Sequence, residues 1–123
     1  MGIIEIASIA TALLTEFFKS AISEIAKKSI EGLFGTIKAK MSEKSNGKKA
    51  IDEFQNSPND NDKQQEFEKQ FLQQMKKDTE FAKKIEMELL PILQHKEIGV
   101  FINRIGKVNK FIQIDNMSGN IKM

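Results

Sequence analysis

The sequence predicts an all-α protein, a four- or five-helix bundle with a long N-terminal helix, followed by a short C-terminal segment of a different kind. Residues 3–41 contain no proline, and their apolar side chains recur at steps of three and four, which is typical of an amphipathic helix. The polar run NSPNDND at 56–62 separates this region from further segments with the same period. In residues 108–114 the period changes to two, which indicates an extended strand.

The N-terminal segment is the element on which the prediction depends. Residues 6–15 carry no charge, so a helix there must be enclosed by protein or by lipid. The segment is expected to be one rod or to bend, either near Lys19 and Ser20 or near Gly32, because glycine inside a helix costs about 1 kcal/mol relative to alanine. The apolar stripe of the rod is predicted to comprise Phe18, Ile22, Ile25, Ser29, Leu33, Ile37 and Met41.

The middle of the chain predicts shorter helices that pack around the first. Residues 42–47 are polar and predict a turn, and 48–56 predict a short helix. Asp62 is expected to cap the next helix, with Gln65 three residues on as in a capping box. Asp78 is expected to cap another, which Pro91 should kink or end. Residues 94–107 are ambiguous, with helix favoured as far as Arg104, so we place the bundle at 1–104 and a separate motif at 105–123.

The residues that enzymes and metal sites require are largely missing. The chain has no cysteine, and its one histidine, His95, is expected to be solvated or satisfied locally. Glu86 and Glu88 are two residues apart and so do not share a helix face. No phosphate-binding glycine loop or nucleophile motif occurs. We therefore expect no enzyme, no cofactor and no metal; with a net charge of +2 and no Trp or Tyr, we also expect no nucleic-acid partner.

The apolar N-terminus does not resemble a secretory signal, because Glu5 precedes the first lysine, Lys19. A permanent transmembrane helix requires about 20 apolar residues, and Glu5 and Glu16 bracket a shorter run. We therefore expect a cytoplasmic protein at rest. A cluster of lysines around the first turn is expected either to lie in a solvated loop, which is favoured, or to meet anionic lipid headgroups. Its members are Lys38, Lys40, Lys44, Lys48 and Lys49.

The N-terminal helix carries two sets of candidate functional residues. Small residues at four-residue spacing let helix backbones approach closely, in membranes as in crowded soluble bundles, and on spacing alone the soluble bundle is favoured. The small set is Ala7, Ser8, Thr11, Ala12 and Thr15. The set expected to enter a bilayer is Ile3, Ile4, Ile6, Ile9, Leu13, Leu14, Phe17 and Phe18. The terminal position would let this helix leave the bundle without threading the chain.

The C-terminus predicts either two short strands joined by an arch or a frayed, disordered end. Isoleucines stacked in register would form dry rows, and amide side chains would form ladders, as cross-β fibrils require. Asp115 to Asn120 is rich in turn formers, and Gly119 is available for positive φ. The residues of this candidate amyloid motif are Ile112, Gln113, Ile114, Asn116, Gly119, Asn120 and Ile121.

The ending FIQIDNMSGNIKM resembles the amyloid signalling motifs of bacterial and archaeal cell-death systems, which are related in style to the RHIM motifs of animal necroptosis. Ile112, Gln113 and Ile114 match the usual Ile-Gln-Ile or Val, and Asp115 stands where glycine is usual. The layout is similar to Bell-domain proteins, which are likened to fungal HeLo domains and to the four-helix bundle of the necroptosis executioner. The resemblance implies a membrane-disrupting effector of an anti-phage immune system, triggered when a receptor of the nucleotide-binding oligomerisation type templates its tail.

Three functional hypotheses follow. The first is a cell-death executioner whose bundle shields the first helix at rest and whose tail assembly gives a homo-oligomer that relocates to the inner face of the cell membrane and binds its lipids. The second is a soluble helical adaptor that binds a partner protein without membrane activity. The third is a small antitoxin-like or regulatory protein with a disordered end.

Overall fold

A computed structural model describes residues 2–20 and 22–99 of the chain. It contains α1 (Ile3–Phe18), α2 (Glu24–Met41), α3 (Ser45–Asn56), α4 (Asn61–Lys77) and α5 (Thr79–Leu93), and a further helical turn at 96–99. All regular structure in these residues is helical, which confirms the all-α prediction. The predicted boundary after 104, the helix to Arg104 beyond Gly99, and the β-arch or disordered tail at 105–123 lie outside the described residues.

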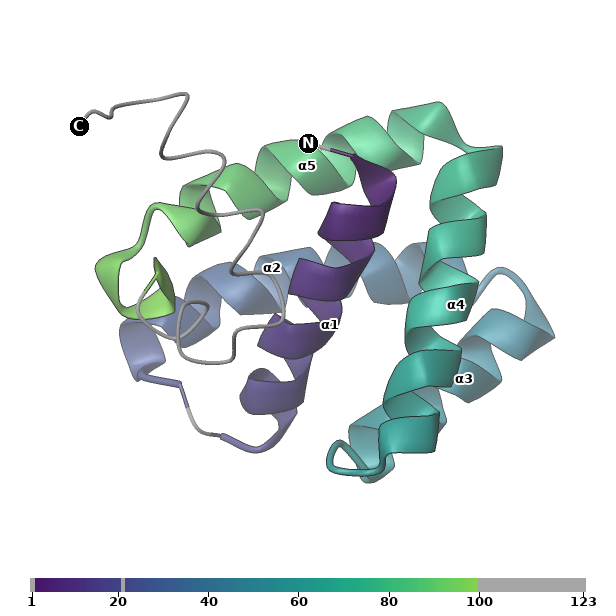
Figure 1. The fold of residues 1–123 in the computed structure, drawn as a ribbon, viewed down its shortest axis with the longest axis horizontal. Helices are drawn as coiled ribbons and strands as arrows, with labels where there is room; N and C mark the ends of the chain where they lie inside the picture. The colour runs from purple at the N-terminus through teal and green to yellow at the C-terminus, as the bar shows by residue number, and fades with distance from the viewer. Residues whose placement is uncertain (1, 21, 100–123) are drawn as a thin grey trace.

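The helices form a bundle in which α1 lies at the centre (Figure 1). The connection between α3 and α4 is short, and these two helices lie side by side as an antiparallel pair (Figure 1). A second antiparallel pair is formed by α2 and α5. The first helix contacts α2, α4 and α5, so it is covered by both pairs.

The N-terminal segment is two helices, so the prediction of one long rod is wrong and the bend near Lys19 and Ser20 is the alternative that the structure contains. Ser20 adopts φ 58°, in the left-handed region, and its N–H donates to the Phe17 carbonyl at 3.1 Å. Ser23 then begins α2, because its hydroxyl accepts from the Ala26 N–H.

This break changes the phase of the apolar stripe. Leu33, Ile37 and Met41 are buried as predicted, but Ile25 is 75% exposed and Ser29 is also exposed. The residues that α2 buries in their place are Ala26 and Ile30. The predicted stripe assumes one continuous helix, whereas α1 ends at Phe18 and α2 begins at Glu24, so the two helices do not share one phase.

Glycines mark a second difference between prediction and structure. The predicted weak point at Gly32 is wrong, because Gly32 and Gly35 both lie inside an unbroken α2. The turn predicted through residue 47 is shorter, because α3 already begins at Ser45. Gly47 makes this start possible: a Cβ there would collide with the backbone of Met41, including its carbonyl oxygen. Glycine thus lets α3 pack directly on the end of α2.

The caps of α4 and α5 were predicted with mixed success. Asp60, not Asp62, caps α4, and its Oδ1 accepts from the N–H groups of Asp62 and Lys63 at 2.9 and 3.4 Å. The cap at Asp78 is confirmed. Pro91 lies inside α5, which ends two residues later at Leu93, so the proline is tolerated for less than one turn before the helix stops.

Candidate functional site: the enclosed first helix

The first helix is buried on most of its circumference. Ile6, Ile9, Leu13 and Leu14 are at most 1% exposed. Ile3, Phe17 and Phe18 are partly buried against the same core, and Ile4 is 63% exposed. Seven of the eight residues expected to enter a bilayer therefore face protein in this structure, and only Ile4 faces mainly solvent.

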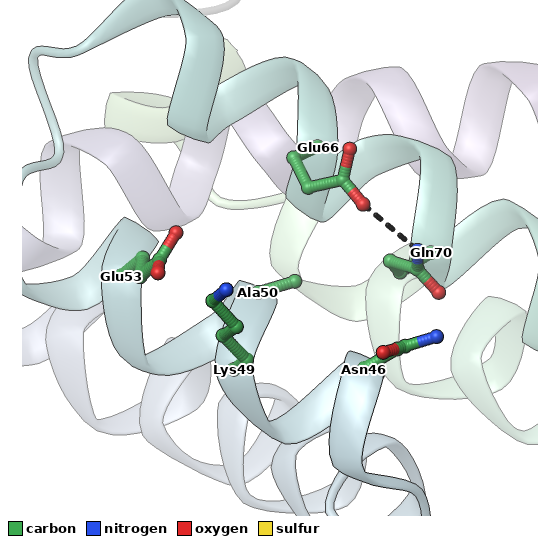
Figure 2. A pocket seen from close by; sticks show the side chains of 6 residues that line it. All are labelled: Asn46, Lys49, Ala50, Glu53, Glu66 and Gln70. Carbon is green, nitrogen blue, oxygen red and sulfur yellow. Dashed lines mark hydrogen bonds between the residues drawn. The ribbon is translucent and has the colours of Figure 1, made fainter.

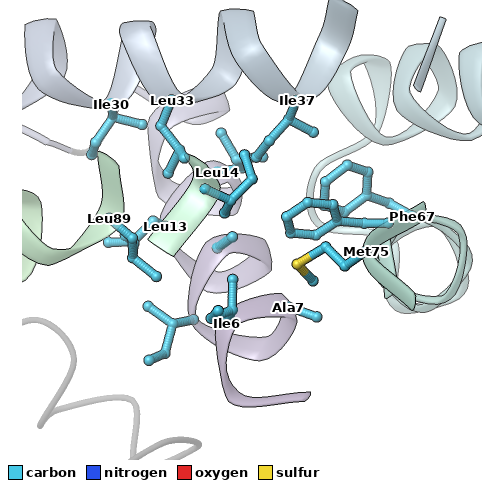
Figure 3. Packing of buried hydrophobic residues seen from close by; sticks show 14 of the residues in the cluster. Ile6, Ala7, Leu13, Leu14, Ile30, Leu33, Ile37, Phe67, Met75 and Leu89 are labelled. Carbon is cyan, nitrogen blue, oxygen red and sulfur yellow. The ribbon is translucent and has the colours of Figure 1, made fainter. Parts of the chain in front are cut away.

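Side chains from all four other helices surround α1, and the ring of Phe54 from α3 lies 5.0 Å from that of Phe18, centre to centre. Figure 3 shows the labelled residues of α1, α2, α4 and α5 pointing into one core. α2 contributes Ile30, Leu33 and Ile37, α4 contributes Phe67 and Met75, and α5 contributes Leu89. Burying a large aliphatic side chain is worth roughly 1.5–3 kcal/mol. Protein, rather than lipid, thus encloses the uncharged stretch in the state described here.

The small residues of α1 line its contacts with neighbouring helices. Ala7 is buried and points toward α4, where Met75 lies opposite (Figure 3). Thr11 is buried, and its hydroxyl donates to the Ala7 carbonyl at 2.7 Å. Thr15 repeats this bond to the Thr11 carbonyl at 2.8 Å. Ala12 is buried and Ser8 half-buried. Close approach to the neighbouring helices of the bundle accounts for the Ala7 and Thr11 row in this state.

Polar side-chain contacts connect the other helices to one another. Thr36 of α2 donates to the Glu88 carboxylate of α5 at 2.9 Å. Lys63 of α4 lies 3.0 Å from the Glu53 carboxylate of α3, an ion pair that lowers the pKa of Glu53 and raises that of Lys63. Lys40 of α2 pairs with Asp78 at the start of α5. These contacts tie α2 through α5 into one shell.

The first helix takes no part in this network. Every side-chain hydrogen bond or ion pair of α1 within the described part of the chain stays on α1 or its C-terminal turn, including the pair between Glu16 and Lys19. Within residues 2–20 and 22–99, the side chains of α1 therefore meet those of the other helices through apolar contact only. Separating α1 from the shell breaks no side-chain hydrogen bond between them.

A small clasp joins the end of the described chain to the start of α2. The Glu97 carboxylate accepts from the Ser23 N–H at 3.2 Å and also from the Ser23 hydroxyl. These bonds lower the pKa of Glu97 below its ordinary value. The next residue, Ile98, is fully buried in the core. Sequence reasoning missed this clasp, because no local pattern pairs residues 74 positions apart.

The lysines around the first turn do not form one free basic patch. Lys40 pairs with Asp78 and Glu43, and Lys48 pairs with Asp52. Lys38 lies 5.7 Å from the ring centre of Phe34, a cation–π distance. Lys44 and Lys49 make no ion pair with any described residue. The favoured expectation of a solvated loop is wrong for four of the five lysines, because two lie in α2 and two in α3, and only Lys44 lies in the connection.

His95 differs from its prediction. The side chain is half-buried, and its Nδ1 atom is buried without a hydrogen-bond partner in the part of the chain that the structure covers. The expectation that it is solvated or satisfied locally is therefore wrong for this atom. Among these same residues, no group of three or more potential metal ligands comes together.

No helix within residues 2–20 and 22–99 is long and apolar enough to cross a membrane. Comparison of the chain with protein-family models, with curated proteins and with solved structures found no match in any of the three. The geometry of α1 and its shell is therefore the observation on which a function must rest.

Proposed function

We propose that this protein is a cell-death executioner that permeabilises membranes with its first helix. The observation that carries the proposal is the way α1 is held: it is the most apolar helix, it is buried, and no side-chain hydrogen bond or ion pair attaches it to another described helix. An ordinary central helix is held by the same kind of packing, so the uncharged stretch at residues 6–15 also matters. Its apolar side chains suit lipid as well as a protein core.

Release of α1 into water is unfavourable, and this disfavours leakage by the resting protein. Exposing Ile6, Ile9, Leu13 and Leu14 together costs roughly 6–12 kcal/mol, at roughly 1.5–3 kcal/mol for each side chain. A bilayer removes most of this cost, because its hydrocarbon replaces the protein core as apolar surroundings. A membrane surface is therefore the expected acceptor for the helix.

The length of α1 favours entry as an assembly rather than as a single span. Its 16 residues extend about 24 Å, at about 1.5 Å each. The hydrocarbon core of a bilayer is about 30 Å thick. We propose that several copies of α1 associate, with Glu5 near an end and Glu16 near the other end or lining a polar lumen. The small set, Ala7 to Thr15, packs against neighbouring helices of the bundle at rest and would then pack α1 against other copies of α1 in the membrane.

The proposed trigger is assembly of the C-terminal motif, templated by a receptor that carries a matching motif. Linking many copies raises their effective concentration without any new contact in the bundle. The clasp supports this order of events, because Glu97 and Ile98 immediately precede the residues that lead to the motif. When the C-terminal motif assembles, a pull on the chain at Glu97 would act on Ser23 and hence on the start of α2.

A reversible lock tests the proposal. The chain has no cysteine, so Ala7→Cys with Met75→Cys would place the only two thiols on facing sides of α1 and α4, and thiol titration of the oxidised protein verifies that they form a disulfide. We expect assembled protein to release dye from liposomes when the disulfide is reduced and to release little when it is oxidised. The matched control is Glu53→Cys with Lys63→Cys, which locks α3 to α4 and should leave leakage unchanged. Equal leakage from oxidised and reduced α1–α4 protein would refute the release of α1.

The rival function is a soluble adaptor, and one observation favours it. Met87 and Leu90 lie three residues apart on α5 and are 73% and 42% exposed, which offers an apolar contact for a partner protein. An adaptor stays in the aqueous fraction after its tail assembles. Liposome flotation of assembled protein therefore separates the two functions, because only the executioner should rise with the lipid.

A further inference from the structure

A polar cavity lies between α3 and α4, away from the enclosed helix. It has a volume of about 280 Å³ and is lined by Asn46, Lys49, Ala50, Glu53, Glu66 and Gln70. Figure 2 shows the first four of these on α3 and the last two on α4, on the facing wall. Ligand pockets for drug-sized molecules hold roughly 300–1,000 Å³. The cavity therefore suits a smaller molecule.

Glu66 and Lys49, which carry opposite charges and line the cavity, form no ion pair with any described residue. The Glu53 carboxylate is already paired with Lys63 at 3.0 Å. Glu66 accepts one hydrogen bond from the Gln70 amide at 2.8 Å but pairs with no cation (Figure 2). Lys49 makes no hydrogen bond or ion pair with any residue of 2–20 or 22–99, although its charge, after that of Lys63, helps to lower the pKa of Glu53. The two helices thus present an unpaired carboxylate and an unpaired ammonium from opposite walls.

We propose that this cavity binds a zwitterionic amino acid or a small metabolite with the same layout of charges. The ligand's ammonium would bind Glu66 and its carboxylate would bind Lys49, and each such charge-assisted hydrogen bond is stronger than a neutral one. The amide side chains of Asn46 and Gln70 offer donors and acceptors to a polar side chain. Ala50 is buried at the cavity wall, and its small side chain leaves room for the ligand between Lys49 and Glu66. This site does not depend on the release of α1.

Amide chemical-shift titration of the full chain tests the site, with L-serine, L-glutamine, putrescine and succinate as probes. At up to about 10 mM, which reaches millimolar dissociation constants, we expect an amino acid to shift the amides of residues 46–53 and 66–70. Putrescine has only the cationic ends and succinate only the anionic ones, so each should cause much smaller shifts. A response to neither amino acid, or equal responses to putrescine or succinate, would overturn the proposal.

Variants separate the site from non-specific binding. Lys49→Met and Glu66→Gln should each weaken binding by at least about tenfold, because each removes a hydrogen bond to a charged group. Lys76→Met and Glu68→Gln make the same chemical changes on α4 outside the cavity, at an exposed and a half-buried position, and should leave binding unchanged. Equal weakening by the control pair would assign the shifts to bulk charge instead.

Discussion

Lys40 Nζ lies 2.6 Å from Asp78 Oδ2, while Asp78 Oδ1 accepts the Phe81 N–H at 3.1 Å. One carboxylate thus caps α5 and also holds the last turn of α2. The hydrogen bond from Lys40, followed by that from Phe81, lowers the pKa of Asp78, and its partner raises the pKa of Lys40. Asp78 follows α4, caps α5 and pairs with Lys40 of α2, so it fixes these three helices relative to one another.

The first prediction concerns the pH dependence of this contact. Asp78 has a folded-state pKa below its ordinary 3.8, so its stabilising contribution is complete above that value and is lost as pH falls toward the lowered pKa. Asp78→Asn should therefore lower the free energy of unfolding at neutral pH, and the difference from the parent should shrink in acid. Urea denaturation between about pH 7 and about pH 2 measures this. A difference that stays constant with pH would contradict it.

The second prediction contrasts two glycines. Gly47→Ala should destabilise the fold, because the new Cβ would collide with the Met41 backbone, which cannot move away as a flexible side chain would. Gly32→Ala should stabilise it by up to about 1 kcal/mol, because nothing lies within 4 Å of the new Cβ and alanine is the better helix former. Thermal unfolding of both variants checks the opposite signs. Changes of the same sign in the two variants would contradict the packing described for Gly47.

The third prediction concerns the core around α1. Leu13→Ala should cost about 2–5 kcal/mol of stability, because the side chain is fully buried and leaves a cavity. Ile25→Ala is the matched control, since its side chain is 75% exposed and its truncation should change stability by less than about 0.5 kcal/mol. Chemical denaturation measures both values. A cost for Ile25 close to that for Leu13 would show that the predicted stripe through Ile25 was buried after all.

The sequence predicted the helices well where the signal was local and poorly where it depended on distant contacts. Asp78 was predicted as a cap because the side chain acts within its own turn. Gly47 was read as part of a turn, since its role depends on Met41 in another helix. The burial of residues 6–15 followed from the absence of charge, whereas the lack of any polar attachment of α1 required knowing where each neighbouring side chain lies.

The clasp gives the last prediction, which links stability to the proposed release. Glu97→Gln removes the charge and replaces one accepting oxygen by a donor, so at least one bond from Ser23 is lost. We expect faster hydrogen exchange at the Ser23 amide and dye leakage at a lower extent of tail assembly. Because the hydrogen bonds from Ser23 lower the pKa of Glu97, protonation of Glu97 in acid weakens these bonds. Acid should therefore speed hydrogen exchange at the Ser23 amide of the parent protein, as Glu97→Gln does.

The neighbouring Lys96→Gln provides the control for this variant, because Lys96 is exposed and has no part in the clasp. It should leave both the exchange of the Ser23 amide and the leakage threshold unchanged. Faster exchange in Glu97→Gln without any change in leakage would mean that the clasp fixes α2 but does not restrain α1. The opposite result, earlier leakage with unchanged exchange, would place the restraint at Ile98, whose burial ties the same segment to the core that encloses α1.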